Sequence, residues 1–116
     1  MASSFENIIE QYIKESFYSY RYEKQYSVRY NNILLKFDFF IPDLKVFIEV
    51  QGSQHSEYNS FFYKDIYDFH QARKRDNYKH AWCGENGFTL VTLNEKEVNQ
   101  LTAQQFKERI VESIYA

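Results

Sequence analysis

The first apolar residues of the chain recur at the spacing of a helix that buries one side. Ser3 and Glu6 match a capping box at the start of this pattern. The apolar positions that follow are Phe5, Ile8, Ile9, Tyr12 and Ile13. Because residues three and four positions apart lie on one side of a helix, this segment predicts a helix that runs to about residue 16.

From residue 18 to residue 51 the pattern is typical of strands. In YSYRYEKQYSVRY (18–30), tyrosines alternate with polar and basic residues, which favours an extended segment with one solvent-facing side. ILLKFDFFI (33–41) and KVFIEVQ (45–51) are rich in apolar and aromatic residues and predict two further strands. Asn31 and Asn32 predict a tight turn because Asn tolerates positive φ, and PDL (42–44) predicts the next connection.

The second half of the chain predicts two more helices and one strand. A helical pattern covers roughly residues 61–84, and Gly84 or Gly87 provides a stop signal. FTLVTL (88–93) predicts a strand, and Thr102 with Gln105 forms a second capping box before a final helix. The order helix, three strands, helix, strand, helix predicts an α/β fold, in which helices are layered on a small sheet.

Composition and charge limit the class of protein. The 116 residues have the length of one domain, and the single cysteine, Cys83, excludes an internal disulfide. No stretch is apolar for long enough to predict a membrane span or a secretory signal, so we expect a soluble protein in the cytoplasm. The net charge of -2 gives no sign of a nucleic-acid partner over the whole chain. Such a partner therefore requires a local basic patch.

Two carboxylates interrupt the apolar strands of residues 33–51. If these strands form a hairpin around residues 43 and 44, one register places the two acids opposite each other. In that register Lys36 and Phe40 lie on the face of the first acid, because side chains alternate along a strand. The pairs are Asp38 with Glu49, Phe40 with Phe47, and Lys36 with Gln51.

The chemistry of such a pair indicates a metal site. Opposed residues have Cβ atoms ~4.5–5.5 Å apart, and two carboxylates at that separation repel unless a proton or cation lies between them. Mg²⁺ suits one or two carboxylates together with waters and phosphate oxygens, and we expect Mn²⁺ to substitute for it. The alternative is that Asp38 and Glu49 face solvent on an exposed hairpin. Apolar residues on both sides of each strand favour interior strands instead, where an unpaired acid is costly.

These residues resemble the signature of the PD-(D/E)XK nuclease superfamily, which has an Asp in one strand and Glu-x-Gln/Lys/Asp in the next. Here the signature is Asp38 in FDFF, with Glu49 and Gln51 in IEVQ. FDFFIPDLKVFIEVQGSQH (37–55), QARKRDNYKHAWCGENGFTLVTL (71–93) and the first helix with Glu6 are similar to phage-type and very-short-patch-repair-like endonucleases, including EDxHD homing endonucleases. The resemblance covers about residues 5 to 93.

The resemblance implies a restriction-endonuclease-like core, αβββαβ(α), with a central mixed sheet flanked by helices, and it implies DNA cleavage. It also implies functional roles for Glu6, Asp38, His55 and Asp76. Gln51 departs from the usual Lys or Asp, so it offers a neutral oxygen ligand or positions a water but supplies no charge. Lys36 across the hairpin and His55 are the two candidates for that missing charge.

Three of these residues also have simpler interpretations. Glu6 is explained equally as the capping partner of Ser3. His55 lies in the polar segment GSQHSEY, where it is either solvated or acts as a general base or acid beside a phosphate. Asp76 either pairs with a basic neighbour on the helix surface or orients His55 or a metal-bound water.

Basic residues gather in one part of the sequence. The cluster is Arg73, Lys74, Arg75, Lys79 and His80, which is either a solvated helix face or a patch that binds phosphates with salt-dependent affinity. Additional candidates for nucleic-acid contacts are Arg21, Lys24, Arg29 and Lys36. His70, His80 and Cys83 match no standard spacing of zinc ligands, so we expect no zinc site.

Two functions follow as hypotheses. The first is a Mg²⁺-dependent DNA endonuclease of the homing, repair or junction-resolving type, which nicks or cuts both strands. Its metal ligands would be Asp38, Glu49 and Gln51. The second is a nuclease-fold module that binds DNA or assembles with other proteins without cleaving. A domain this small reads little sequence, so we expect a homodimer, a separate specificity partner, or recognition of branched DNA.

Overall fold

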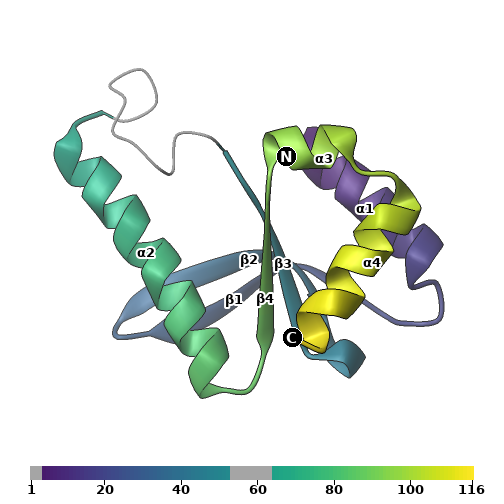
Figure 1. The fold of residues 1–116 in the computed structure, drawn as a ribbon. Coiled ribbons are helices and arrows are strands. Elements are labelled where there is room, and N and C mark those ends of the chain that lie inside the picture. Colours follow the sequence, from purple (N-terminus) through teal and green to yellow (C-terminus); the bar gives the residue numbers. More distant parts are fainter. Residues whose placement is uncertain (1–3, 53–63) are drawn as a thin grey trace.

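A four-stranded sheet in the order β1-β2-β3-β4 forms the centre of the molecule (Figure 1). In this computed structural model, residues 4–52 and 64–116 are described. The strands are β1 (Glu23–Tyr30), β2 (Ile33–Ile41), β3 (Val46–Gln51) and β4 (Thr89–Asn94). The pairs β1/β2 and β2/β3 are antiparallel and β3/β4 is parallel, so the expected mixed sheet is confirmed.

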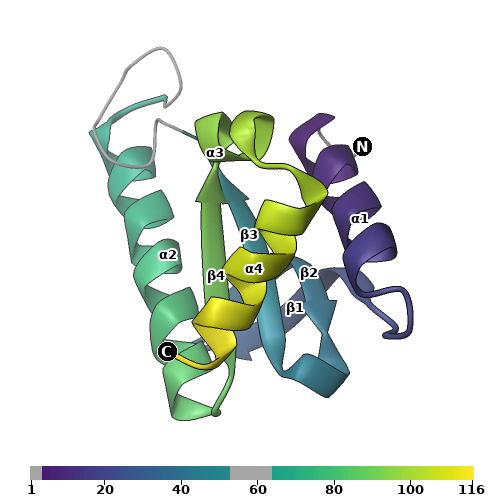
Figure 2. The same ribbon diagram turned by 45° about the vertical axis from the view of Figure 1, so that its right-hand side comes forward.

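Helices cover both faces of the sheet (Figure 2). The elements around the strands are α1 (Ser4–Ser16), the short 3-10 helix η1 (Pro42–Leu44), α2 (Ile66–Glu85), α3 (Glu95–Gln100) and α4 (Ala103–Ile114). On one face, α1, α3 and α4 enclose a cluster that includes Ile9, Phe39, Ile48 and Phe106. On the other face, α2 covers a smaller aromatic cluster that includes Phe37, Phe47 and Trp82. The α/β prediction is therefore confirmed.

The hairpin between β1 and β2 follows the turn chemistry of its sequence. Asn31 and Asn32 have φ of 49° and 64°, and they connect the pair Tyr30 and Ile33. Both central residues of a tight β-hairpin turn of this kind need positive φ, which Asn tolerates. The strand predicted over residues 18–30 is shorter than expected and begins at Glu23. The segment before it turns, and the N–H of Tyr20 donates to the carbonyl of Phe17.

The long helix α2 begins later than its pattern predicts. The side chain of Asp65 accepts a hydrogen bond from the backbone N–H of Asp68, which caps the first turn. The predicted residues 61–63 lie outside the described residues, as does Ser3 of the first expected capping box. The helix ends at Glu85, and Gly87 with φ of 75° continues the chain towards β4. A stop near Gly87 is therefore confirmed.

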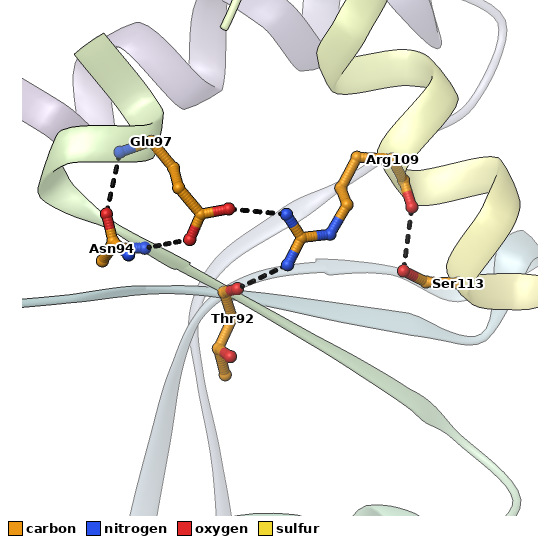
Figure 3. A network of polar contacts seen from close by, with 5 residues as sticks. All are labelled: Thr92, Asn94, Glu97, Arg109 and Ser113. Atoms are coloured by element: carbon orange, nitrogen blue, oxygen red, sulfur yellow. Dashed lines mark hydrogen bonds and ion pairs between the residues drawn. The ribbon is translucent and has the colours of Figure 1, made fainter. Parts of the chain in front are cut away.

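The sequence-based order of elements missed the helix α3. The side chain of Asn94 accepts from the backbone N–H of Glu97, whose own side chain accepts from the N–H of Asn94. This capping box was a readable signal, but the helix has only six residues. Figure 3 shows how it is fixed: Arg109 of α4 lies 2.6 Å from the carboxylate of Glu97 and also donates to the carbonyl of Thr92 in β4. These contacts join α3, α4 and β4 on one face.

No helix in residues 4–52 and 64–116 combines the length and the apolar character needed to cross a membrane.

Candidate active site

The carboxylates of Asp38 in β2 and Glu49 in β3 each accept a hydrogen bond from the backbone of the other strand. The backbone N–H of Asp38 donates to Glu49 Oε1 at 3.1 Å, and the N–H of Val50 donates to Asp38 Oδ2 at 2.9 Å. Each acid therefore takes a backbone donor from the other strand. Since β2 and β3 are the inner strands of the sheet, the prediction that these acids lie on interior strands is confirmed.

The register predicted for this hairpin is correct only near its turn. Phe40 pairs with Phe47 as expected, but the β2–β3 ladder runs only from Ile41↔Val46 to Phe39↔Ile48. Beyond it, the side chains of the acids replace backbone pairing. The predicted pair Lys36 with Gln51 is wrong, because the β2–β3 ladder ends at Phe39↔Ile48; Lys36 keeps its pairing with Ser27 of β1, and Gln51 keeps its pairing with Asn94 of β4. Figure 1 shows β2 and β3 diverging away from the connection between them, as a strongly twisted sheet allows.

The regular alternation of β2 is interrupted at Asp38. Phe37 and Phe40 both pack in the cluster under α2, whereas Phe39 packs in the cluster on the opposite face. The prediction that Asp38 shares a face with both Lys36 and Phe40 is therefore wrong, since Lys36 is exposed on the side away from α2. The interruption coincides with Gln25 of β1, whose φ is 52° and whose pairing with β2 is missing from the ladder.

Glu49 is the buried acid of the site, with 6% of its surface exposed. Its second oxygen, Oε2, lies 2.8 Å from Nζ of Lys79, which reaches it from α2. The side chain of Lys79 is 15% exposed, and its ammonium lies 5.6 Å from the ring centre of Phe37. Lys79 was expected either on a solvated helix face or in a patch that binds phosphates. The structure places it inside the site, because it lies on the side of α2 that faces the sheet.

The electrostatics of the site favour a positive charge. Burial raises the pKa of the Glu49 carboxyl to about 7, with the charge of Asp38 adding to the increase and Lys79 opposing it. Burial also raises the pKa of Asp38, against the hydrogen bond from Val50 and the charge of Lys79. Both carboxylates are thus less stable in the ionised form than exposed ones, and a cation close to them offsets that cost.

A third acid reaches the site from the opposite face of the sheet. Glu6, in the first turn of α1, accepts a hydrogen bond from the side chain of Gln25 at 3.3 Å. Gln25 also hydrogen-bonds the carboxylate of Asp38. Burial, followed by the charge of Asp38, raises the pKa of Glu6. The structure therefore brings Glu6 and Asp38 together through Gln25, a residue that the sequence analysis did not single out.

Three predicted site residues remain, and each lies in a different part of the chain. Gln51 is half-buried on the same side of β3 as Glu49, two residues further along the strand. Asp76 is half-buried on α2, three residues and so nearly one turn before Lys79. His55 lies outside the described residues. The roles given to these three residues stay predictions.

The basic residues occupy different surfaces. On α2, the exposed Arg73 lies 5.7 Å over the ring of Phe69 and Lys74 lies 5.6 Å over the ring of Tyr78, while Arg75 is exposed. On β1, Lys24 forms an ion pair with Glu10 of α1 at 3.0 Å. The exposed Arg21, Arg29 and Lys36 complete the set.

One face of the β1–β2 hairpin carries exposed side chains. Ser27 pairs with Lys36 and Arg29 pairs with Leu34, so these four side chains lie on the same face, and all are exposed. The opposite face of the hairpin packs towards α2. Lys36 is two residues from Asp38 on the same strand. A basic surface of the hairpin therefore leads to the paired carboxylates.

Within residues 4–52 and 64–116, no group of three or more His, Cys, Asp and Glu side chains is arranged to hold a metal. The acidic ligands that the site provides for a cation are the two carboxylates of Asp38 and Glu49, each hydrogen-bonded to the backbone of the other strand. Cys83 is buried, and burial raises the pKa of its thiol to about 12, so the thiol stays protonated. His70 and His80 are exposed on α2.

Comparisons with known proteins connect the fold to one solved structure. The catalytic domain of the homing endonuclease I-Bth0305I superposes with a TM-score of 0.59 over 97% of this chain and 99% of that domain, at 18% identity. The chain therefore has the fold of an endonuclease catalytic domain, with a mixed sheet flanked by helices. No family model matches the sequence.

Three viral proteins are related in sequence over part of the chain. "Uncharacterized protein 307L" of Invertebrate iridescent virus 6 is 32% identical over 62 residues, which is 53% of this chain and 32% of that protein. "Uncharacterized protein 094L" of Frog virus 3 (isolate Goorha) is 40% identical over 60 residues, or 51% of this chain and 39% of that protein. "Uncharacterized protein 033L" of Invertebrate iridescent virus 3 is 33% identical over 59 residues, or 51% and 30% of the two proteins. The matches span about a third of the length of these curated relatives.

Proposed function

We propose that the protein is a metal-dependent endonuclease that hydrolyses phosphodiester bonds in DNA. One observation carries the proposal: Asp38 and Glu49 lie on neighbouring inner strands and are each held by a backbone N–H of the other strand. A protein stabilised only by apolar packing has no use for two such acids, because burying them is costly. The endonuclease fold adds a precedent for this chemistry, although fold alone does not assign function.

The donor set fits a hard divalent cation. Mg²⁺ takes one or two carboxylates, keeps several waters and accepts phosphate oxygens, and Mn²⁺ replaces it at such sites. Asp38 and Glu49 would hold the ion, with the amide oxygen of Gln51 as an additional ligand on the same side of β3. When bound, the ion polarises a phosphate oxygen and lowers the pKa of a coordinated water.

The other residues of the site position these groups. Gln25 and Glu6 restrict the carboxylate of Asp38 on the α1 side, and Lys79 holds Glu49 on the α2 side. His55 is the proposed general base or acid, and Asp76 the group that orients His55 or a water. DNA phosphates would approach along the exposed face of the hairpin, where Arg29 and Lys36 are exposed.

A second candidate function is DNA binding without cleavage. The observation in its favour is the neutral Gln51, which stands where the superfamily signature usually has Lys or Asp. A module of this kind would keep the fold and the basic hairpin surface and lose turnover. Whether the chain acts as a homodimer or with a specificity partner, on duplex or branched DNA, belongs to the same proposal.

The test compares cleavage of supercoiled plasmid and of a four-way junction with Mg²⁺, Mn²⁺ or EDTA. We expect cleavage with both metals, none with EDTA, and a loss of about 100-fold or more in Asp38→Asn. Lys14→Gln, a charge change in the last turn of α1, is the control and keeps full activity. Cleavage that survives EDTA or Asp38→Asn refutes the metal mechanism, and DNA binding by a wild-type protein that never cleaves supports the second candidate.

A further inference from the structure

Lys79 differs from the other basic residues of α2 in its surroundings. Its side chain is 15% exposed, whereas the neighbouring Arg73, Lys74 and Arg75 are exposed. Its ammonium lies 2.8 Å from Glu49 Oε2 and 5.6 Å from the ring centre of Phe37. Because a lysine normally keeps its charged end in water, this position is unusual for a surface residue of a helix.

The position of Lys79 also answers a chemical need of the site. The residue two positions after Glu49 on β3 is Gln51, whose amide carries no charge. Lys36, one of the two candidates for the missing charge, is exposed on the side of β2 away from α2 and pairs with Ser27. Lys79 reaches the same carboxylate from α2, thirty residues further along the chain.

A purely structural ion pair explains these contacts less well. Glu49 accepts the backbone N–H of Asp38 on Oε1 and the ammonium on Oε2, and each oxygen keeps a lone pair for a further ligand. The positive charge of Lys79 lowers the pKa of Asp38 as well as that of Glu49, so the ammonium lies close enough to stabilise both carboxylates. Replacing a buried ion pair by apolar residues is often neutral or stabilising, so stability alone gives little reason for a lysine here.

We propose that Lys79 is a catalytic residue of the endonuclease, supplying from helix α2 the amine that strand β3 lacks at Gln51. Its ammonium contacts a non-bridging oxygen of the scissile phosphate and neutralises charge that develops in the transition state. In the reaction, the oxygen of a water forms a new bond to phosphorus, one ester P–O bond breaks, and the proton of the water ends on the leaving oxygen. Lys79 keeps its proton throughout and is not consumed.

This inference rests on the proposed nuclease function, and a transplanted lysine tests it. The variants are Lys79→Met, Lys79→Met with Gln51→Lys, and, as the control, Lys107→Met at an exposed position of α4. Single-turnover cleavage of plasmid is measured with Mg²⁺, DNA affinity with Ca²⁺, and Mn²⁺ binding to the protein without DNA by calorimetry. Thermal unfolding reports whether each variant is folded.

We expect Lys79→Met to cleave about 100-fold more slowly, with a DNA affinity within about threefold of wild type. Mn²⁺ should bind this variant at least as tightly as wild type, because a competing positive charge is gone. Adding Gln51→Lys should restore about tenfold or more of the lost rate, since it returns an amine to the same side of β3. Lys107→Met should cleave like the wild type.

Two results overturn the proposal while the nuclease function stands. One is a Lys79→Met protein that cleaves within about threefold of wild type while Asp38→Asn does not cleave. The other is a loss of cleavage matched by an equal loss of DNA affinity or by weaker Mn²⁺ binding, which makes Lys79 a tether or a structural residue. A wild-type protein that cleaves no DNA refutes the nuclease function itself. If Lys79→Met does not fold alone, the double variant decides: a rate within about tenfold of wild type supports the proposal, and a lower rate overturns it.

Discussion

Gln25 lies across from Asp38 at the point where the ladder between β1 and β2 is interrupted, and its backbone is in the left-handed region with φ of 52°. Its side chain links Asp38 to Glu6 of α1. A β strand gains nothing from a left-handed Gln, since a side chain in that conformation costs on the order of 1 kcal/mol. Backbone strain and the contact with Asp38 therefore coincide at one residue.

The strain at Gln25 predicts a reversed order of stability for two small replacements. The free energy of unfolding of Gln25→Gly should be about 1 kcal/mol larger than that of Gln25→Ala, so the glycine variant is the more stable one. Glycine adopts positive φ without a steric cost. Chemical denaturation of both variants measures the difference. The control is Ser27, exposed and in the same strand but without positive φ, where Ala should be the more stable replacement by about 0.5–1 kcal/mol.

Both Gln25 variants should also lose activity. Without the amide, Asp38 and Glu6 lose the hydrogen-bonding group between them, and we expect cleavage to fall by about tenfold at unchanged DNA affinity. Equal cleavage rates for wild type, Gln25→Gly and Gln25→Ala in a Mg²⁺ assay would show that the link has no part in positioning Asp38.

The buried Glu49 predicts the pH dependence of stability in the absence of metal. Its pKa of about 7 in the folded protein exceeds its ordinary value of 4.5, so the folded state binds more protons between these two pH values. The free energy of unfolding of wild type, compared with Glu49→Gln, should therefore fall as pH rises from about 4.5 to about 7. The change is on the order of 2 kcal/mol. Denaturation curves at a series of pH values measure it.

Glu97 provides a control of opposite sign. The hydrogen bond from Arg109 holds the pKa of Glu97 below its ordinary value, so its contribution to stability is present above pH 4.5 and is lost as pH falls below that value. The difference between wild type and Glu97→Gln should thus shrink in acid, where the Glu49 difference is most favourable. Two curves with the same sign of slope would contradict one of the two assignments, and two flat curves would contradict both.

The exposed face of the β1–β2 hairpin predicts the salt dependence of DNA binding. Arg29 and Lys36 are exposed on that face, and each phosphate contact adds about 0.9 to the slope of log affinity against log salt. Replacing both residues by Gln should lower the slope by about two for all DNA sequences. Fluorescence anisotropy in Ca²⁺ at several salt concentrations measures it.

The control for this surface makes the same change in charge on two helices instead of on the hairpin. Lys14 of α1 and Lys107 of α4 are exposed, and both helices cover the face opposite α2 (Figure 2). Replacing both by Gln should leave the salt slope unchanged. An equal loss of slope in the two double variants would indicate a nonspecific effect of net charge, and would remove the hairpin face as the DNA-binding surface.

Arg109 should affect stability without affecting chemistry. Its ion pair with Glu97 is partly exposed, and its second nitrogen donates to the carbonyl of Thr92 in β4 (Figure 3). Arg109→Ala should lower the free energy of unfolding by about 1 kcal/mol, because exposed pairs contribute little and one backbone hydrogen bond is lost. Plasmid cleavage at a temperature where the variant is folded should match wild type. A large loss of cleavage would place this network in the site.

Much of the fold could be predicted from short segments of the sequence. The apolar period of α1, the turn at Asn31 and Asn32, the capping box at Thr102 and the pair Phe40 with Phe47 all depend on neighbours in the sequence, and the structure confirms them. Helix α3 was missed because its six residues carry little periodic signal apart from the cap at Asn94.

The candidate site could be predicted only in part from the sequence. Paired carboxylates within apolar strands follow from residue type and strand period, so Asp38 and Glu49 could be identified from the sequence. The break in alternation at Asp38 could not, because it coincides with the left-handed backbone of Gln25 in another strand, and Gln gives no local signal for that conformation.

The sequence by itself thus determined most of the elements and the inner position of the two acids, since period and residue type are local properties. Only the tertiary structure decided which amine meets Glu49. Lys36 is the nearer residue in sequence, but Lys79 makes the contact, because α2 returns across the face that carries Phe37 and Phe47. Packing of that aromatic cluster sets the position of the helix, and a contact between residues thirty positions apart follows from packing rather than from local pattern.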